Sequence, residues 1–173
     1  NTNVPDISKR SKCSVGSIYH HFLNKEEIAG QLYLQCMKEF REALCESIDL
    51  PENAQTNIRN IVICFLEFAE KNRMIAQYLW LARHTEYLNS QIQQPTVVGF
   101  DEFGRRVTKV IKRGIRLGEI PPLDAEIFWI IVFGMPLSYM RDWLDGFAER
   151  SPGEVAPMIA DACWAGLTGL TKK

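Results

Sequence analysis

The sequence predicts an all-helical chain, with two short helices at the front and a larger helical body behind them. Three observations support this fold class. The period-two alternation typical of strands is not sustained anywhere along the chain. Apolar residues recur instead at helical spacing, and capping residues precede most of these segments. With 173 residues, 46% of them hydrophobic, the chain can bury a sizeable core.

The two front helices are predicted from their caps. Asn3 followed by Asp6 can cap a helix over VPDISKRS, in which Pro5 is tolerated because it lies in the first turn. Ser14 can cap a second helix that ends at about Phe22. A turn of about two residues separates the two segments, which is the spacing of a helix-turn-helix.

Charge is distributed unevenly between this front segment and the rest. Residues 1–25 hold four basic residues and one acid, a net charge of +3. Since the whole chain carries −1, the other 148 residues carry −4. A basic head on an acidic body is expected where only the head meets nucleic acid.

The body begins with a long helix. Asn24 and Glu27 have capping-box spacing and predict a helix from Lys25 to Ser47. Asp49 and Glu52, with a proline between them, predict the start of the next helix, which runs to about residue 71. Asn72 then restarts the chain into RMIAQYLWLARH, and the polar segment after it predicts a loop.

Three further helices are predicted in the second half. One runs over residues 96–117 and ends before Gly118. The next carries a run from Ile127 to Met135 that is apolar on all sides, which predicts burial on all sides, and Pro136 predicts a kink. Ser151 and Glu154 have capping-box spacing and start the last helix, which reaches about residue 170.

The helix over residues 96–117 carries a basic face. A solvated surface is the simplest interpretation, and a second DNA contact or electrostatic help in binding an anionic ligand are the alternatives. The face comprises Arg105, Arg106, Lys109, Lys112, Arg113 and Arg116.

The front helices suggest a surface for DNA. We expect Ile7, Ile18 and Phe22 to point inward, with Cys13 packed beneath them in the turn. Small residues at the start of the second helix let its backbone enter a major groove. The outward residues expected to read bases or contact phosphates are Ser14, Val15, Gly16, Ser17, Tyr19, His20 and Lys25.

The segment ISKRSKCSVGSIYHHFLNKEEI resembles the DNA-binding signature of the tetracycline-repressor (TetR) family of bacterial transcription regulators. In that family a turn ending in serine leads to a short recognition helix that closes on Tyr-x-x-Phe, followed by a Lys-Glu-Glu start to a long helix. The matching residues are Ser14, Gly16, Tyr19, His20, Phe22, Lys25 and Glu26. The segment RLGEIPPLDAEI also resembles a turn between two body helices of these regulators.

Two departures accompany the resemblance. Lys12 stands where the family usually has glycine, so a left-handed conformation is expected there at some cost. The family's first helix would precede residue 1, so the module is expected to be truncated at its N-terminus. We therefore expect a module over residues 1–23, a linking helix over 24–47, and an effector-binding and dimerisation body over 48–173.

The resemblance implies a cytoplasmic regulator, most simply a repressor, that binds a palindromic operator on double-stranded DNA as a homodimer and is released by a small-molecule effector. For the effector site we select aromatic and polar residues of the middle helices, although such a stripe is often only core. These are Phe65, Tyr78, Trp80, His84, Tyr87, Phe103, Trp129, Phe133 and Tyr139.

The last two long helices are the expected dimer interface, because their apolar content exceeds what one internal face needs. Internal packing is the alternative. The residues selected are Trp143, Leu144, Met158, Ile159, Trp164 and Leu167. An all-helical carrier or protein-interaction domain without DNA binding remains the rival function.

Metal chemistry and catalysis find little support. His20 and His21 are adjacent, so on a helix they point about 100° apart and cannot readily share a metal ion. No nucleophile elbow, phosphate loop or paired carboxylates with a base are visible. The five cysteines form no Cys-x-x-Cys pair and are expected as free thiols in a reducing compartment. No cofactor, membrane span or enzymatic activity is therefore expected.

Overall fold

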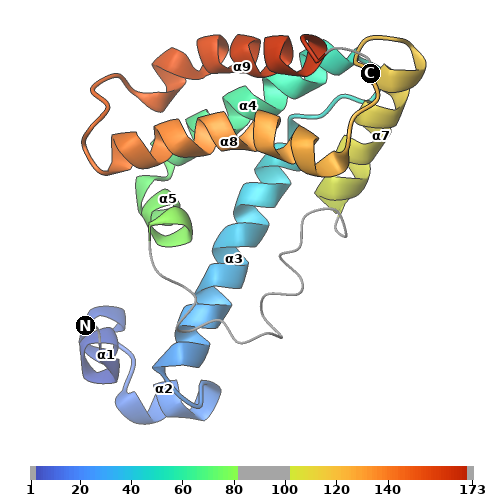
Figure 1. Cartoon of the computed structure of the whole chain (residues 1–173). Coiled ribbons are helices and arrows are strands. Elements are labelled where there is room, and N and C mark those ends of the chain that lie inside the picture. Colours follow the sequence, from blue (N-terminus) through green and yellow to red (C-terminus); the bar gives the residue numbers. More distant parts are fainter. Residues whose placement is uncertain (1–2, 82–101, 171–173) are drawn as a thin grey trace.

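The computed structural model describes residues 3–81 and 102–170, and within these ranges every regular element is a helix. The elements are α1 (Val4–Ser11), α2 (Val15–His21), α3 (Lys25–Glu46), α4 (Ala54–Lys71), α5 (Arg73–Trp80), α7 (Glu102–Arg116), α8 (Ala125–Leu144) and α9 (Pro152–Thr168). In Figure 1, α1 and α2 form a small head at one end of α3, and α4, α7, α8 and α9 lie around its opposite end. Helix α5 contacts α3 nearer to the head.

Side-chain caps begin most of the helices, as predicted. Asn3 and Ser151 each form a reciprocal capping box, with Asp6 and Glu154 respectively. The side chain of Asn24 accepts a hydrogen bond from the backbone N–H of residue 27 at the start of α3. These caps are local, so each can be recognised from a few adjacent residues.

The predicted start of α4 was wrong. Asn53 is the cap, and its side chain accepts a 2.7 Å hydrogen bond from the backbone N–H of Thr56. The preceding segment is shaped instead by Asn57, which is fully buried. Its amide nitrogen donates to the carbonyls of Asp49, Glu52 and Asn53, and its oxygen accepts from the backbone N–H of Asp49. A buried amide with its donors and acceptor paired holds this turn.

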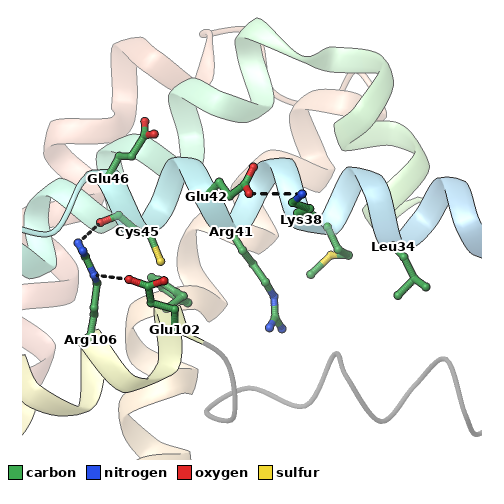
Figure 2. Close-up of a pocket in the computed structure, with 10 residues that line it drawn as sticks. Leu34, Lys38, Arg41, Glu42, Cys45, Glu46, Glu102 and Arg106 are labelled. Carbon is green, nitrogen blue, oxygen red and sulfur yellow. Dashed lines mark hydrogen bonds and ion pairs between the residues drawn. The ribbon is translucent and has the colours of Figure 1, made fainter.

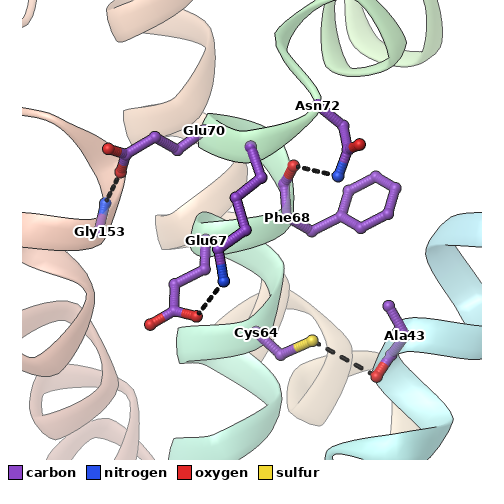
Figure 3. A network of polar contacts seen from close by, with 8 residues as sticks. Ala43, Cys64, Glu67, Phe68, Glu70, Asn72 and Gly153 are labelled. Carbon is purple, nitrogen blue, oxygen red and sulfur yellow. Dashed lines mark hydrogen bonds and ion pairs between the residues drawn. The ribbon is translucent and has the colours of Figure 1, made fainter.

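Helix α4 is the centre of the body and packs against α3, α5, α7, α8 and α9. Its buried side chains include Ile58, Val62, Phe65 and Leu66. Figure 3 shows two polar contacts that join α4 to its neighbours. The thiol of Cys64 donates to the carbonyl of Ala43 on α3 at 3.4 Å, and the carboxylate of Glu70 accepts from the first turn of α9 at 2.6 Å.

The basic face of α7 is partly structural. Arg113 donates from Nη1 to the carbonyls of Leu50, Pro51 and Glu52, and so closes the α3–α4 connection. Arg106 donates to the carbonyl of Cys45 in the last turn of α3 at 3.0 Å. A guanidinium with several donors suits such a cluster of carbonyls. These two arginines are therefore anchors of α7 rather than members of a solvated face.

Helix α8 runs from Ala125 through Pro136 to Leu144 as one element, but it is not buried on all sides. Its inner face is buried at Phe128 and Val132, whereas Ile127, Ile130 and Met135 are 40%, 58% and 39% exposed. The prediction of burial all round was wrong because other helices of the same chain cover α8 on one side only. An apolar strip therefore remains on the surface.

Candidate functional site

The outer face of α2 is exposed at the positions predicted to contact DNA. Val15 and Tyr19 are 38% and 53% exposed, and Ser17 and His20 are also exposed. The Ser14 hydroxyl caps the helix by accepting a 3.0 Å hydrogen bond from the backbone N–H of residue 17. The first turn holds no acid, so the positive end of the helix dipole is not neutralised there.

Gly16 is not required by packing within the chain. A Cβ added there would meet only the Ser14 hydroxyl, at 4.0 Å, and would collide with nothing. The missing side chain instead keeps the first turn of α2 slim on its exposed side. This is the property that close approach to a duplex needs.

The inner side of the head differs from the prediction in one residue. Val4 and Ile18 are buried, and Ile7 and Phe22 are half-buried, so three of the four expected anchors face inward. Cys13 is exposed. Its backbone makes the contact instead, since the Ser8 hydroxyl donates to the Cys13 carbonyl at 2.6 Å and fixes the turn.

Lys12 ends α1 in the left-handed conformation expected where the family usually has glycine, with φ of 59°.

The connection from α2 to α3 is short, as is the turn between α1 and α2. Glu27 accepts a 2.7 Å hydrogen bond from the backbone N–H of Leu23, which ties the last residues of the head to the first turn of α3. Lys25, at the start of α3, is exposed. The head is thus joined to α3 by a short connection and a hydrogen bond.

The body contains a cavity of about 300 Å³ between α3, α4, α5, α7 and α8. Five of the nine residues predicted for the effector site line it, namely Phe65, Trp80, Phe103, Trp129 and Phe133. Tyr78 lies nearby on α5, but its hydroxyl donates to the carbonyl of Ala29 at 2.6 Å. Tyr139 is not among the lining residues; its hydroxyl donates to the carbonyl of Arg150 at 2.9 Å. His84 and Tyr87 lie outside the described residues.

Six lining residues were missed, five of them on α3. They are Tyr33, Met37, Phe40, Arg41, Leu44 and Leu137. A detectable signal was present, because Tyr33, Met37 and Arg41 follow one another at intervals of four along a largely apolar helix face. A cation that continues an apolar stripe is expected to face a ligand or an opposite charge more often than a core.

Arg41 acts electrostatically on this cavity. Burial raises the pKa of Tyr33, and the positive charge of Arg41 partly opposes that rise. The Tyr33 hydroxyl therefore stays neutral at physiological pH. Arg41 also lines an adjoining cavity of about 620 Å³ between α3 and α7, together with Glu42, Glu46 and Glu102. In Figure 2 the side chain of Arg41 points away from α3 on the same side of this helix as Glu102. Lys38 and Glu42 contact each other on a different side of α3.

The predicted dimer residues are only partly on the surface. Leu144 and Leu167 are buried in the core, so their assignment to an interface was wrong: α8 and α9 pack these side chains against the same chain. Trp143, Ile159 and Trp164 are half-buried against that core, and Met158 is 61% exposed. The guanidinium of Arg73 lies 4.2 Å from the ring centre of Trp143, which connects α5 to α8.

Family models match both parts of the chain. The model of the tetracyclin repressor-like C-terminal domain matches residues 33–168, and that of the bacterial regulatory proteins of the tetR family matches residues 1–32. The chain belongs to the TetR family of bacterial transcription regulators. It is thus a regulator with an N-terminal DNA-binding module and a C-terminal ligand-binding body. Both models describe transcription factors rather than enzymes.

Other TetR-type proteins resemble the chain at low identity. The uncharacterized HTH-type transcriptional regulator YhgD of Bacillus subtilis (strain 168) is 20% identical over 142 residues, which are 82% of this chain and 73% of YhgD. A TetR family transcription regulator from Marinobacter aquaeolei VT8 has a TM-score of 0.77 at 15% identity, over 96% of this chain and 84% of that one. The TetR family transcriptional regulator PfmR from Thermus thermophilus has a TM-score of 0.73 at 21% identity, over 99% and 88% of the two chains.

These structures confirm the TetR fold, with a helix-turn-helix followed by an all-helical body. No described helix is long and apolar enough to span a membrane. Residues 3–81 and 102–170 also contain no group of three histidine, cysteine or acidic side chains placed to hold a metal ion.

Proposed function

We propose that the chain represses transcription as a homodimer that binds a palindromic operator through α2 and is released when a small molecule occupies the body cavity. The observation that carries this proposal is the exposed outer face of α2, which has a capped and slim first turn and is tied directly to α3. That face fits a major groove, and α3 connects it to the cavity wall.

The contacts proposed with DNA follow from the positions on α2. Val15, Gly16 and Ser17 lie in its first turn, where recognition helices meet base edges. Phosphates are assigned to the residues that flank this turn and carry hydroxyl, imidazole or ammonium groups. These are Ser14, Tyr19, His20 and Lys25.

The proposed dimer interface is revised to the exposed apolar strip of α8 and the small residues of α9. Ile127, Ile130 and Met135 lie on the outer side of α8, and Ala162 and Ala165 are exposed on α9. Two such helix pairs from two copies can form a four-helix seam, with the small residues allowing close approach. The dimer supplies two recognition helices for two half-sites.

The proposed release mechanism depends on α3. This helix contributes five lining residues to the cavity at one part of its length and holds the head at its first turn. An occupant of the cavity shifts the equilibrium only if it binds the arrangement that cannot engage DNA more tightly. A nearly complete switch needs a difference of about 5 kcal/mol between the two arrangements.

Selection of duplexes from a random pool, followed by gel shifts over a range of salt concentrations, tests the proposal. We expect a palindromic site whose affinity falls as salt rises. Tyr19→Ala and Lys25→Met should weaken binding to all duplexes, whereas changes at Val15 or Ser17 should alter base preference. Lys38→Met is the matched control for the lost charge, because Lys38 is exposed and pairs with Glu42 on the body portion of α3. Equal affinity of all variants for every duplex would reject this surface and favour a carrier function.

A further inference from the structure

The walls of the 300 Å³ cavity are mainly aromatic. The ring centres of Trp129 and Phe133 lie 5.1 Å apart with an interplanar angle of 34°. Those of Phe65 and Trp80 are separated by 5.2 Å at 35°, and Phe40 meets Trp80 edge-on at 5.0 Å. Such walls present both ring faces and ring edges, so they favour a flat, polarisable occupant over a flexible one.

The polar groups of the cavity are few and lie on α3. Among the described residues that line it, Arg41 carries the one charge, and Tyr33 adds a phenol. Both side chains are half-buried. A guanidinium keeps its charge at any physiological pH and presents a planar fork of donors that matches a carboxylate. The neutral Tyr33 hydroxyl can donate to the same anion.

The volume allows a small occupant. A cavity of about 300 Å³ can hold a compound of one or two fused rings with a single small substituent. The choice of an aromatic over an aliphatic occupant therefore rests on the aromatic walls.

We infer that the effector of the proposed function is a small aromatic carboxylate, whose rings lie among Phe65, Trp80 and Phe133 and whose carboxylate pairs with Arg41. Only the role of this compound as effector rests on the proposed function. Binding itself requires no DNA. The carboxylate is the part of the ligand that Arg41 selects, because a guanidinium has five N–H donors and can bind a ligand anion alongside its other contacts in the protein.

Quenching of tryptophan fluorescence measures binding directly, because Trp80 and Trp129 line the cavity. The probes are naphthalene-2-carboxylate, the neutral naphthalene-2-carboxamide, and octanoate as an aliphatic anion of limited size. We expect naphthalene-2-carboxylate to bind about tenfold more tightly than the amide and than octanoate. Equal binding of carboxylate and amide would overturn the role of the anion, and tighter binding of octanoate would overturn the aromatic class.

Two charge-removing variants complete the test. Arg41→Met should weaken binding of the carboxylate about tenfold or more while leaving the affinity for the amide within about twofold, which also shows that the cavity is still folded. Lys38→Met removes the same charge one turn earlier on α3 and should change neither affinity, because Lys38 is 66% exposed and pairs with Glu42. An unchanged affinity of Arg41→Met for the carboxylate would sink the inference, as would failure of all three probes to bind.

A gel shift with the selected operator then separates the two proposals. Binding of naphthalene-2-carboxylate without any effect on operator affinity would support the ligand class but contradict its role as effector. Release of DNA by the carboxylate and not by the amide would support both.

Discussion

The hydroxyl of Tyr78 on α5 donates a 2.6 Å hydrogen bond to the backbone carbonyl of Ala29 on α3. The acceptor lies in the second turn of α3, close to the head, and the donor lies two residues from Trp80 in the cavity wall. Arg73 at the other end of α5 stacks on Trp143 of α8. Helix α5 thus connects the cavity and the body to the end of α3 that carries the head.

Replacement of Tyr78 by phenylalanine tests this connection. The ring stays and the hydrogen bond is lost, so we expect the free energy of unfolding to fall by about 1 kcal/mol. We also expect the operator dissociation constant to change by about threefold or more, because the head end of α3 loses a tether to the body. Urea unfolding and gel shifts measure the two effects.

Tyr139→Phe is the matched control for Tyr78→Phe. Its hydroxyl also donates to a backbone carbonyl, that of Arg150, but this contact lies in the α8–α9 connection. It should lower stability by a similar amount and leave operator affinity unchanged. If both variants bind the operator as the original chain does, α5 does not connect the cavity to the head.

The revised dimer interface predicts the effect of a charge on α8. Ile130→Arg adds a cation to an exposed apolar position, so the monomer should fold normally while the proposed seam is disrupted. Light scattering at micromolar concentration should show a monomer, and operator affinity should fall sharply. Leu32→Arg changes a residue of similar exposure on α3 and should leave a dimer. A dimer that survives Ile130→Arg would place the interface elsewhere.

The α3–α4 connection predicts an unequal role for two neighbouring cations of α7. Arg113→Met removes the donor for three backbone carbonyls, so unfolding should require about 2–3 kcal/mol less. Lys112 is exposed, and Lys112→Met should change stability by no more than about 0.5 kcal/mol. Urea unfolding curves compare the two variants. Equal stability of the two variants would show that Arg113 does not stabilise the α3–α4 connection.

The cysteines predict a graded reactivity. Burial raises the pKa of the Cys163 thiol to about 11, and this thiol donates to the carbonyl of Ile131 at 3.3 Å. The folded chain therefore holds this proton more tightly than the unfolded chain, whose cysteines ionise near pH 9. Between pH 9 and about pH 11, the contribution of the Cys163 thiol to the free energy of unfolding is therefore lost as the pH rises.

Labelling with a thiol reagent at pH 8, read by mass spectrometry of peptides, checks this order. Cys13 is exposed and should react first, and Cys163 should react only after denaturant is added. Raising the pH to 9 should not label Cys163 in the folded chain. Labelling of Cys163 as fast as Cys13 would contradict its burial.

Helix starts that depend on neighbouring residues were predicted correctly, whereas features that depend on packing between distant helices were not. The caps at Asn3, Ser14, Asn24 and Ser151 depend on residues within three positions, and the structure confirms all four. The start of α4 was misplaced because Asp49 and Glu52 also look like caps. What decides between them and Asn53 is burial of the Asn57 amide and the reach of Arg113 from a distant helix.

The need for tertiary information also explains the outcomes for the cavity and for the dimer interface. Aromatic residues of the middle helices were selected by type, and five of them meet in one cavity. The side of α3 that closes this cavity could not be chosen without knowing which helices cover it. Leu144 and Leu167 were assigned to the surface because apolar content alone does not distinguish an inner from an outer face. The DNA, effector and dimer roles of the selected residues remain predictions.

The unbroken run of α3 has a mechanical consequence. Its 22 residues span about 33 Å, and Arg106 and Cys64 fasten its last turns to the body. A rotation of about 5° around that fastened end would displace the first turn by about 3 Å. The hydrogen bond from Tyr78 to Ala29 lies near the end that would move most, so this contact opposes such a rotation where it has the greatest effect.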